Sequence, residues 1–135
     1  MTLRPSVPLA VACASIIGTG CGVRPAEMPM VEGITRAEVR SRTAGLGSIT
    51  DSARIAALVT FVNQQRSGWS APALGVPVGQ VGVTLYREER VVESIFCGPG
   101  FLELRRGGQF YSKSAGPDAI VRFRELLAPY PVGCT

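Results

Sequence analysis

Four short strand-like segments in the second half of the chain are separated by tight turns, a pattern that few folds can accommodate. Residues 81–86 alternate valine and leucine with glycine, threonine and tyrosine, as a half-buried strand does. Further strand-like segments follow at residues 91–97, 101–104 and 109–113, with glycine-rich or charged turns between them. Strands joined by turns this short pair antiparallel, so the pattern predicts an antiparallel meander.

Two amphipathic helices are expected, one before the meander and one after it. The first is predicted from an N-cap at Thr50 or Asp51 to about Arg66, because its apolar residues recur at the i, i+3, i+4 and i+7 spacing of a buried stripe. The second is predicted to open at Gly116-Pro117-Asp118, with proline at the first helical position and an acid in the first turn. The apolar stripes consist of Ile55, Leu58, Val59 and Val62 in the first helix and of Ile120, Phe123 and Leu127 in the second.

One further strand is expected before the first helix. Residues 34–42 mix β-branched and charged side chains, which is typical of an edge strand. Residues 43–48 are predicted to be a loop, and Gly45-Leu46-Gly47-Ser48 is interpreted as a flexible turn because it lacks the lysine and the glycine spacing of a phosphate-binding loop. The expected fold class is α+β, an antiparallel sheet in the order β-α-β-β-β(-β)-α with two helices packed on one face.

The N-terminus has the features of an export signal. Arg4 is followed by an uncharged, mostly apolar run at residues 7–17, and the small residues Thr19 and Gly20 then precede Cys21. A helix that spans a bilayer needs about 20 apolar residues. This shorter run suits the hydrophobic region of a signal peptide instead. The segment resembles the leader of a bacterial lipoprotein, in which small residues come immediately before a cysteine that accepts the lipid.

This resemblance implies three parts of the chain. Residues 1–20 would be a signal peptide, residues 21–32 a lipidated N-terminus with a proline-containing tether, and residues 33–135 a single small α+β domain. Cleavage before Cys21 would leave a diacylglycerol-modified thiol and a new N-terminus that is usually acylated. Each buried methylene contributes about 0.8 kcal/mol, so two or three acyl chains hold a protein firmly to a membrane.

The implied location is the cell envelope, with the membrane as a partner through the N-terminal lipid anchor. In a source with two membranes, the outer membrane is expected. The alternative is cleavage by an ordinary signal peptidase, which would give a soluble secreted or periplasmic protein.

Composition restricts the chemistry of the domain. The chain contains no histidine, which excludes Ser-His-Asp and Cys-His nucleophile pairs, imidazole bases and histidine metal sites. The formal net charge of +4 is small and scattered, so no nucleic-acid partner is expected. Two cysteines without histidine do not suggest a zinc site. No catalytic residue, cofactor or metal site is therefore predicted.

Cys97 and Cys134 are the cysteines that fall within the expected domain. An exported location favours their oxidation to a disulfide, which would tie the C-terminal tail to the sheet. Such a bond would stabilise the domain by about 4 kcal/mol on the chain-entropy account. The alternative is two independent thiols that lie too far apart to join.

Four side chains form the predicted interaction surface. Tyr86 and Tyr111 are expected to flank a shallow sheet surface, and Arg105 and Arg106, placed at a hairpin turn, could bind a carboxylate or phosphate group. The alternative interpretation is a half-buried sheet face and a solvated turn.

Two pairs of acidic residues are candidates for acid–base chemistry. Glu88 and Glu89 are adjacent in a turn between arginines, so we expect them to point apart and to be neutralised by their neighbours. Glu93 and Glu103 lie on neighbouring predicted strands and could approach each other on the solvent face. Neither pair is predicted to be catalytic.

The expected function is that of a membrane-anchored envelope lipoprotein, a non-enzymatic module that binds a protein or polymer partner. The lack of histidine and of a catalytic constellation favours it. One alternative is a small secreted enzyme or ligand carrier that uses carboxylates in a cleft between helix and sheet. Another is a secreted protein inhibitor that offers the Gly98-Pro99-Gly100 turn or the Arg105-Arg106 turn to its target.

Overall fold

A computed structural model describes residues 26–71, 78–131, 133 and 134. The elements within them are β1 (Arg36–Ser41), β2 (Gly45–Ile49), α1 (Ser52–Gln64), β3 (Val81–Arg87), β4 (Arg90–Gly98), β5 (Phe101–Arg106), β6 (Gln109–Ser114) and α2 (Pro117–Leu127). The expected signal peptide and Cys21 lie outside the described residues. Among the residues that are described, no helix combines the length and the apolar character that a membrane span requires.

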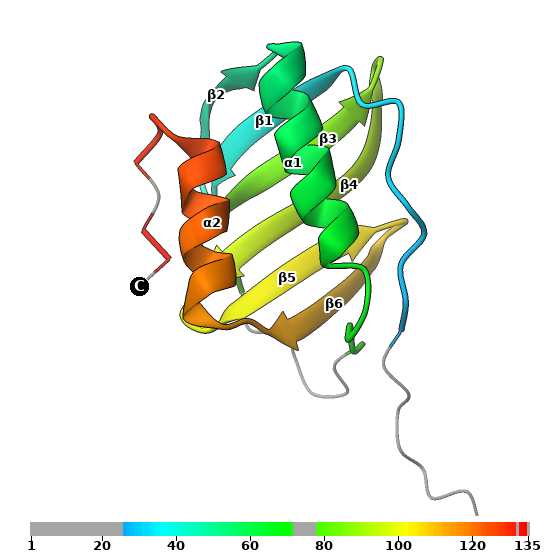
Figure 1. Cartoon of the computed structure of the whole chain (residues 1–135), viewed down its shortest axis with the longest axis vertical. Helices are drawn as coiled ribbons and strands as arrows, with labels where there is room; N and C mark the ends of the chain where they lie inside the picture. The colour runs from blue at the N-terminus through cyan, green and yellow to red at the C-terminus, as the bar shows by residue number, and fades with distance from the viewer. Residues whose placement is uncertain (1–25, 72–77, 132, 135) are drawn as a thin grey trace, which may run out of the picture.

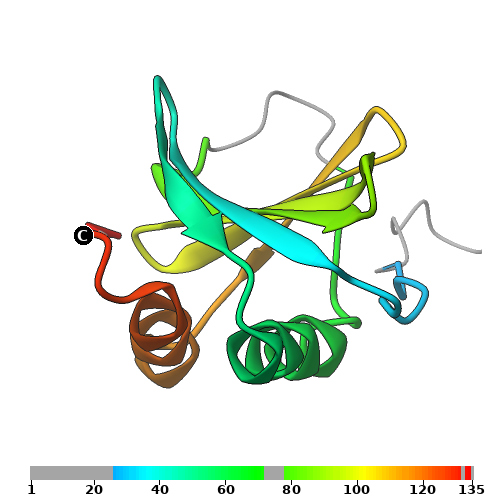
Figure 2. The same ribbon diagram turned by 90° about the horizontal axis from the view of Figure 1, so that it is seen from above.

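The strands form one sheet in the order β2-β1-β3-β4-β5-β6, and each neighbouring pair is antiparallel. Both helices lie across the same face of the sheet (Figure 1). Seen from above, α1 and α2 sit side by side beneath the sheet, and the β1–β2 hairpin rises on the opposite side (Figure 2). The α+β class, the meander and the one-sided arrangement of the helices are confirmed.

The core fills the space between the helices and the sheet. The predicted helical stripes supply it, together with the alternate residues of the central strands. Phe61 of α1 and Phe123 of α2 stack with ring centroids 5.3 Å apart, which joins the two helices to each other. Asp51 caps α1 by accepting a hydrogen bond from the Arg54 backbone N–H at 2.9 Å, one of the two caps expected from the sequence.

The segment predicted as a loop at residues 43–48 is instead largely the strand β2, which pairs with β1 at the edge of the sheet. The sequence of β2 has few β-branched residues, so its own pattern does not indicate a strand. Backbone hydrogen bonds to β1 hold these residues in the extended conformation. The Tyr130 ring packs where a side chain at Gly47 would stand. The glycine is thus needed for the close approach of Tyr130 and does not form the flexible turn that the sequence predicted.

Residues 26–32, the second half of the expected tether, pack on the domain. Met28 and Val31 are buried in the core cluster. The Asn63 side chain accepts a hydrogen bond from the Val31 N–H at 2.8 Å and donates one to the Val31 carbonyl at 3.0 Å. Ala26 forms a backbone bridge with Trp69, whose own side chain is buried in the core. Hydrogen bonds to α1 and its C-terminal turn therefore hold this segment in place.

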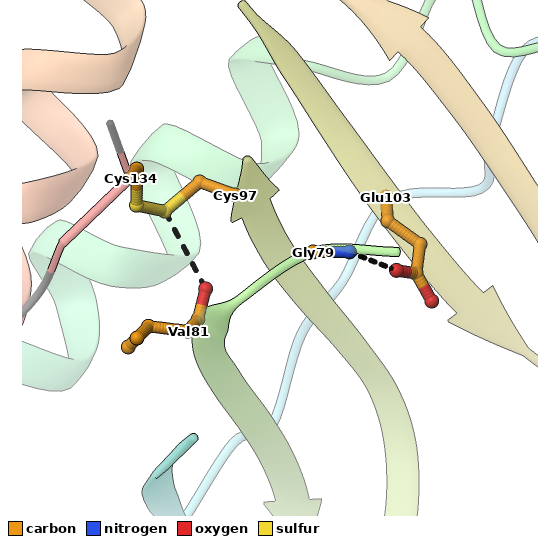
Figure 3. Close-up of a disulfide and its surroundings, with 5 residues drawn as sticks. All are labelled: Gly79, Val81, Cys97, Glu103 and Cys134. Carbon is orange, nitrogen blue, oxygen red and sulfur yellow. Dashed lines mark hydrogen bonds between the residues drawn. A yellow bond between two sulfur atoms is a disulfide. The ribbon is translucent and has the colours of Figure 1, made fainter. Parts of the chain in front are cut away.

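Cys97 at the end of β4 and Cys134 near the C-terminus lie at disulfide-bonding distance, with Cα atoms 5.6 Å apart (Figure 3). Both are buried. The predicted pair is thus brought together, and the tail beyond α2 is drawn back to the sheet.

Candidate functional site

The face of the sheet without helices carries a cleft of about 330 Å³. Side chains of a strand alternate between the two faces, and on this face they are mostly polar or aromatic. Arginines and aromatic residues line much of the cleft, namely Arg40, Arg42, Arg105, Tyr86 and Phe96. No acidic residue is among the described residues that line it. The lining of the cleft is therefore positively charged.

Arg105 is held in place from two sides. Its Nε donates a hydrogen bond to the Glu103 carboxylate at 2.7 Å, and its guanidinium lies 4.7 Å from the centroid of the Phe96 ring and 5.3 Å from that of Phe110. Glu103 is only 1% exposed and also accepts a hydrogen bond at 2.7 Å from the Gly79 N–H (Figure 3). These contacts fix the guanidinium plane before any ligand arrives.

Two glycines make room for the Phe96 ring. A Cβ atom on Gly82 would collide with the Ile95 carbonyl and lie 2.6 Å from the Phe96 Cα, and one on Gly79 would meet the Phe96 Cβ. Without side chains at these positions, Phe96 packs closely against β3 and is buried. Phe96, which also lines the cleft, thus forms part of its floor.

A second arginine–aromatic contact stands at the other end of the cleft. The Arg36 guanidinium lies 3.9 Å from the centroid of Tyr86, and the Tyr86 hydroxyl donates to the Glu38 carboxylate at 3.0 Å. That hydrogen bond, more than the neighbouring arginines, lowers the pKa of Glu38. Burial, followed by the nearby Glu38 carboxylate, raises the pKa of Tyr86. Glu38 is thereby held ionised and Tyr86 neutral.

Arg40 and Arg42 differ from the other two arginines. Both are exposed, and within the described part of the chain their guanidinium groups make no hydrogen bond or salt bridge. Between them and Arg105 lie Thr84 and Ser94, whose hydroxyls hydrogen-bond to each other at 2.9 Å. The cleft thus offers two exposed guanidinium groups, of Arg40 and Arg42, whose hydrogen-bond donors are unused by the described residues, and a third, of Arg105, that is already oriented.

The structure separates the four residues of the predicted interaction surface. Tyr86 and Arg105 line the cleft. Arg106 and Tyr111 lie on the opposite, helix-bearing face, where Tyr111 packs against the core. The prediction placed the two tyrosines on one surface, but their positions in the strand register put them on different faces.

Glu93 and Glu103 are also separated. Glu93 lies on the helix-bearing face, 1% exposed, and its Oε2 accepts a hydrogen bond from Arg106 Nη1 at 3.1 Å. Burial raises the pKa of Glu93, and the Arg106 guanidinium opposes that effect. The expected approach of the two carboxylates on the solvent face is wrong. The arrangement that the carboxylate enzyme would need is therefore not found among the described residues.

The described residues contain no group of three or more side chains that could hold a metal ion. The lining of the cleft instead suits hydrogen bonding to an anion, because guanidinium groups donate to carboxylates and phosphates in a planar, two-bond geometry. No protein-family model matches this chain, and no curated protein or solved structure is significantly similar to it.

The sequence interpretation missed Arg40, Arg42 and Phe96 as parts of one site. Arg40 and Arg42 were read as charges of an edge strand, whereas β1 lies between β2 and β3. The signal that could have found Phe96 is the pair of glycines at the start of β3, since glycine in a strand often marks close approach by another group.

Proposed function

We propose that this protein is a non-enzymatic binding module, held at the cell envelope by a lipid on Cys21, and that its helix-free sheet face binds an envelope protein or polymer. The observation that carries the proposal is the cleft on that face, in which the guanidinium groups of Arg40 and Arg42 make no hydrogen bond or salt bridge to another described residue and stand beside Arg105, which Glu103 holds in place. A surface whose donors are already oriented binds with a smaller loss of side-chain freedom.

The lining of the cleft favours binding over catalysis. Its two aliphatic hydroxyls on the central strands, Thr84 and Ser94, hydrogen-bond to each other, and the Ser41 hydroxyl donates to a backbone carbonyl, so none of the three is paired with a basic side chain. The Tyr86 hydroxyl donates to the Glu38 carboxylate, and its raised pKa keeps it protonated. A nucleophile needs such a base, and acid–base catalysis needs a group that titrates near the working pH. The arginines of the cleft cannot act as such a base or as a general acid near neutral pH, because arginine stays protonated.

The cellular location in this proposal comes from the leader. The resemblance of residues 1–21 to a lipoprotein signal supports export and acylation at Cys21. The Cys97–Cys134 pair agrees with an oxidising compartment, where we propose that the two form a disulfide.

Photo-crosslinking from two matched positions tests the binding face. Val91 lines the cleft and is 59% exposed, whereas Val121 is 50% exposed on α2, on the other side of the molecule. A photoreactive amino acid is placed at one position or the other in the whole chain, expressed with its leader. We expect adducts with an envelope component from position 91 and none from position 121. Equal adducts from both positions, or adducts only from position 121, would contradict the proposed binding face.

The anchor is tested separately by intact-mass measurement of the membrane-extracted protein. The proposal predicts loss of residues 1–20 and the added mass of diacylglycerol on Cys21. Cys21→Ala should keep its full leader and gain no lipid. A full-length chain without acyl mass in the wild-type protein would remove the anchoring half of the proposal.

A further inference from the structure

We infer that the cleft on the helix-free face binds an acidic segment of a partner protein, in which a carboxylate stands next to an aliphatic side chain. The inference rests on the proposed function and states which kind of envelope partner the cleft suits. Three properties of the cleft each support an acidic protein segment as the ligand, namely its charge, its apolar rim and its size.

The charge of the cleft requires an anionic ligand. Three arginines and no acidic residue are among the described residues that line it, and the guanidinium groups of Arg40 and Arg42 make no hydrogen bond or salt bridge to another described residue. Arg40 is attracted to Glu38 only at longer range. The same face already shows which anion its arginines accept. Arg36 makes a salt bridge to the Glu38 carboxylate, and Arg105 makes one to Glu103 at 2.7 Å. A carboxylate from another chain would meet Arg40 and Arg42 in the same way.

The rim of the cleft adds an apolar requirement. Val78 and Val91 line it and are 40% and 59% exposed. Contact with an aliphatic side chain would remove this apolar surface from water, which favours binding. A protein segment can place an aliphatic group beside a carboxylate, which a uronic acid polymer cannot.

The aromatic residues also argue against a sugar polymer. Sugar rings are commonly bound by stacking on a free aromatic face. Here Tyr86 carries the Arg36 guanidinium over its ring, and Phe96 carries that of Arg105. These faces are therefore occupied, and the cleft presents guanidinium groups in their place.

The volume limits how much of the partner can enter. At about 330 Å³ the cleft is at the lower end of the range of ligand sites. It accommodates one or two side chains, so the contact is with a short segment and not with a folded surface. Salt should weaken the complex, because its attraction is between largely exposed charges.

Fluorescence anisotropy on the whole chain with labelled seven-residue peptides tests the inference. One peptide carries two glutamates beside a leucine, and its matched control carries glutamine in place of both glutamates. We expect the glutamate peptide to bind at least about tenfold more tightly, a difference that corresponds to about 1.4 kcal/mol. Arg40→Glu and Arg42→Glu should each remove most of this preference. Arg122→Glu, on the exposed face of α2, should leave it unchanged.

Three results would overturn the inference. Equal binding of the glutamate and glutamine peptides would remove the carboxylate from recognition. Equal losses in Arg40→Glu and Arg122→Glu would show general charge attraction instead of the cleft. Binding of a polyuronate oligosaccharide, without binding of either peptide, would make the ligand a sugar polymer.

Thermal unfolding of Arg40→Glu and Arg42→Glu controls for folding, which we expect to be intact because both side chains are exposed. Failure of this inference remains distinct from failure of the proposed function. Position 91 could crosslink an envelope component while no glutamate peptide binds, and then only the choice of partner is wrong. Crosslinking from position 121 instead would reject the binding face itself.

Discussion

Glu93 and Glu103 are each 1% exposed but lie on opposite faces of the sheet, where two consecutive arginines bind them. Arg105 contacts Glu103 under the cleft, and Arg106 contacts Glu93 on the helix-bearing face. Neighbouring residues of a strand point to opposite faces, so one dipeptide neutralises two buried carboxylates. Arg106 also donates to the Pro29 carbonyl at 3.3 Å, which connects the sheet to the N-terminal segment.

Glu103→Gln should destabilise the domain by about 1–3 kcal/mol, because the charge-assisted bond to Arg105 is lost while a side-chain oxygen remains for the Gly79 N–H. Urea unfolding measures the change. The exposed turn residue Glu88 provides the control, and Glu88→Gln should shift the free energy of unfolding by less than about 0.5 kcal/mol. Equal changes in the free energy of unfolding for the two substitutions would show that the buried Glu103–Arg105 pair does not stabilise the domain more than an exposed carboxylate does.

The raised pKa of Glu93 predicts a pH-dependent contribution to stability. A folded-state pKa above the unfolded value means that the folded state keeps its proton longer. The contribution is thus fully present below the ordinary value of 4.5 and is lost as the pH rises through the raised value. Urea unfolding of the wild type and of Glu93→Gln from about pH 4 to about pH 7 isolates it. The wild-type free energy of unfolding should fall relative to that of the variant over this range, and a constant difference would contradict the assignment.

Gly82→Ala should destabilise the protein by about 1–3 kcal/mol or more, because the new methyl group meets the Ile95 carbonyl and the Phe96 backbone, neither of which can move without disturbing β4. Gly45→Ala is the matched control in the same sheet, since nothing lies within 4 Å of a Cβ there. Thermal unfolding compares the two. Similar melting temperatures would mean that the floor of the cleft is not closely packed.

Loss of the Cys97–Cys134 disulfide should lower the free energy of unfolding by up to about 4 kcal/mol for a separation of 37 residues. Urea unfolding with and without dithiothreitol measures this effect. The double variant Cys97→Ala, Cys134→Ala serves as control, because its stability should not respond to the reductant. A wild-type protein that is equally indifferent to dithiothreitol would show that the two cysteines are not joined in solution.

Asn63→Ala should release the N-terminal segment, because this side chain makes both hydrogen bonds to Val31. Hydrogen exchange should become faster at the Val31 amide and its neighbours, while the central strands keep their protection. Gln64→Ala, at an exposed position next to it on α1, is the control. Unchanged exchange at Val31 in Asn63→Ala would show that other contacts hold the segment.

Most of the fold follows from periodicity. The alternation in residues 81–86 and the stripe of Ile55, Leu58 and Val62 both report on burial, and the apolar residues of both are buried as expected. Thr84, expected on the exposed side of its strand, is also buried, at 5% exposure. β2 could not be predicted in this way. Its residues Gly45–Ile49 form a strand because β1 offers hydrogen-bond partners and Tyr130 packs on Gly47, and both contacts come from distant parts of the chain.

The candidate site was only half predictable for a similar reason. Tyr86 and Arg105 were identified as surface residues, but the sequence did not show that they share a face with Arg40, which pairs across β1 and β3 with Gly82. The face on which a strand residue lies depends on the pairing register. Tyr111 pairs with Leu104, which is in line with Ile95 and Val83 of the core, so it lies on the face opposite to that of Tyr86.

The docking of the N-terminal segment limits how far the domain can move from an anchor. Hydrogen bonds fix the chain from Ala26 onward, so on the anchoring that we propose only five peptide steps separate the lipid on Cys21 from the folded body. Fully stretched, they reach about 17 Å. A linker of this length would keep the domain within about 17 Å of the lipid-bearing residue. The acidic segment that we propose as its ligand would then have to lie close to the bilayer surface.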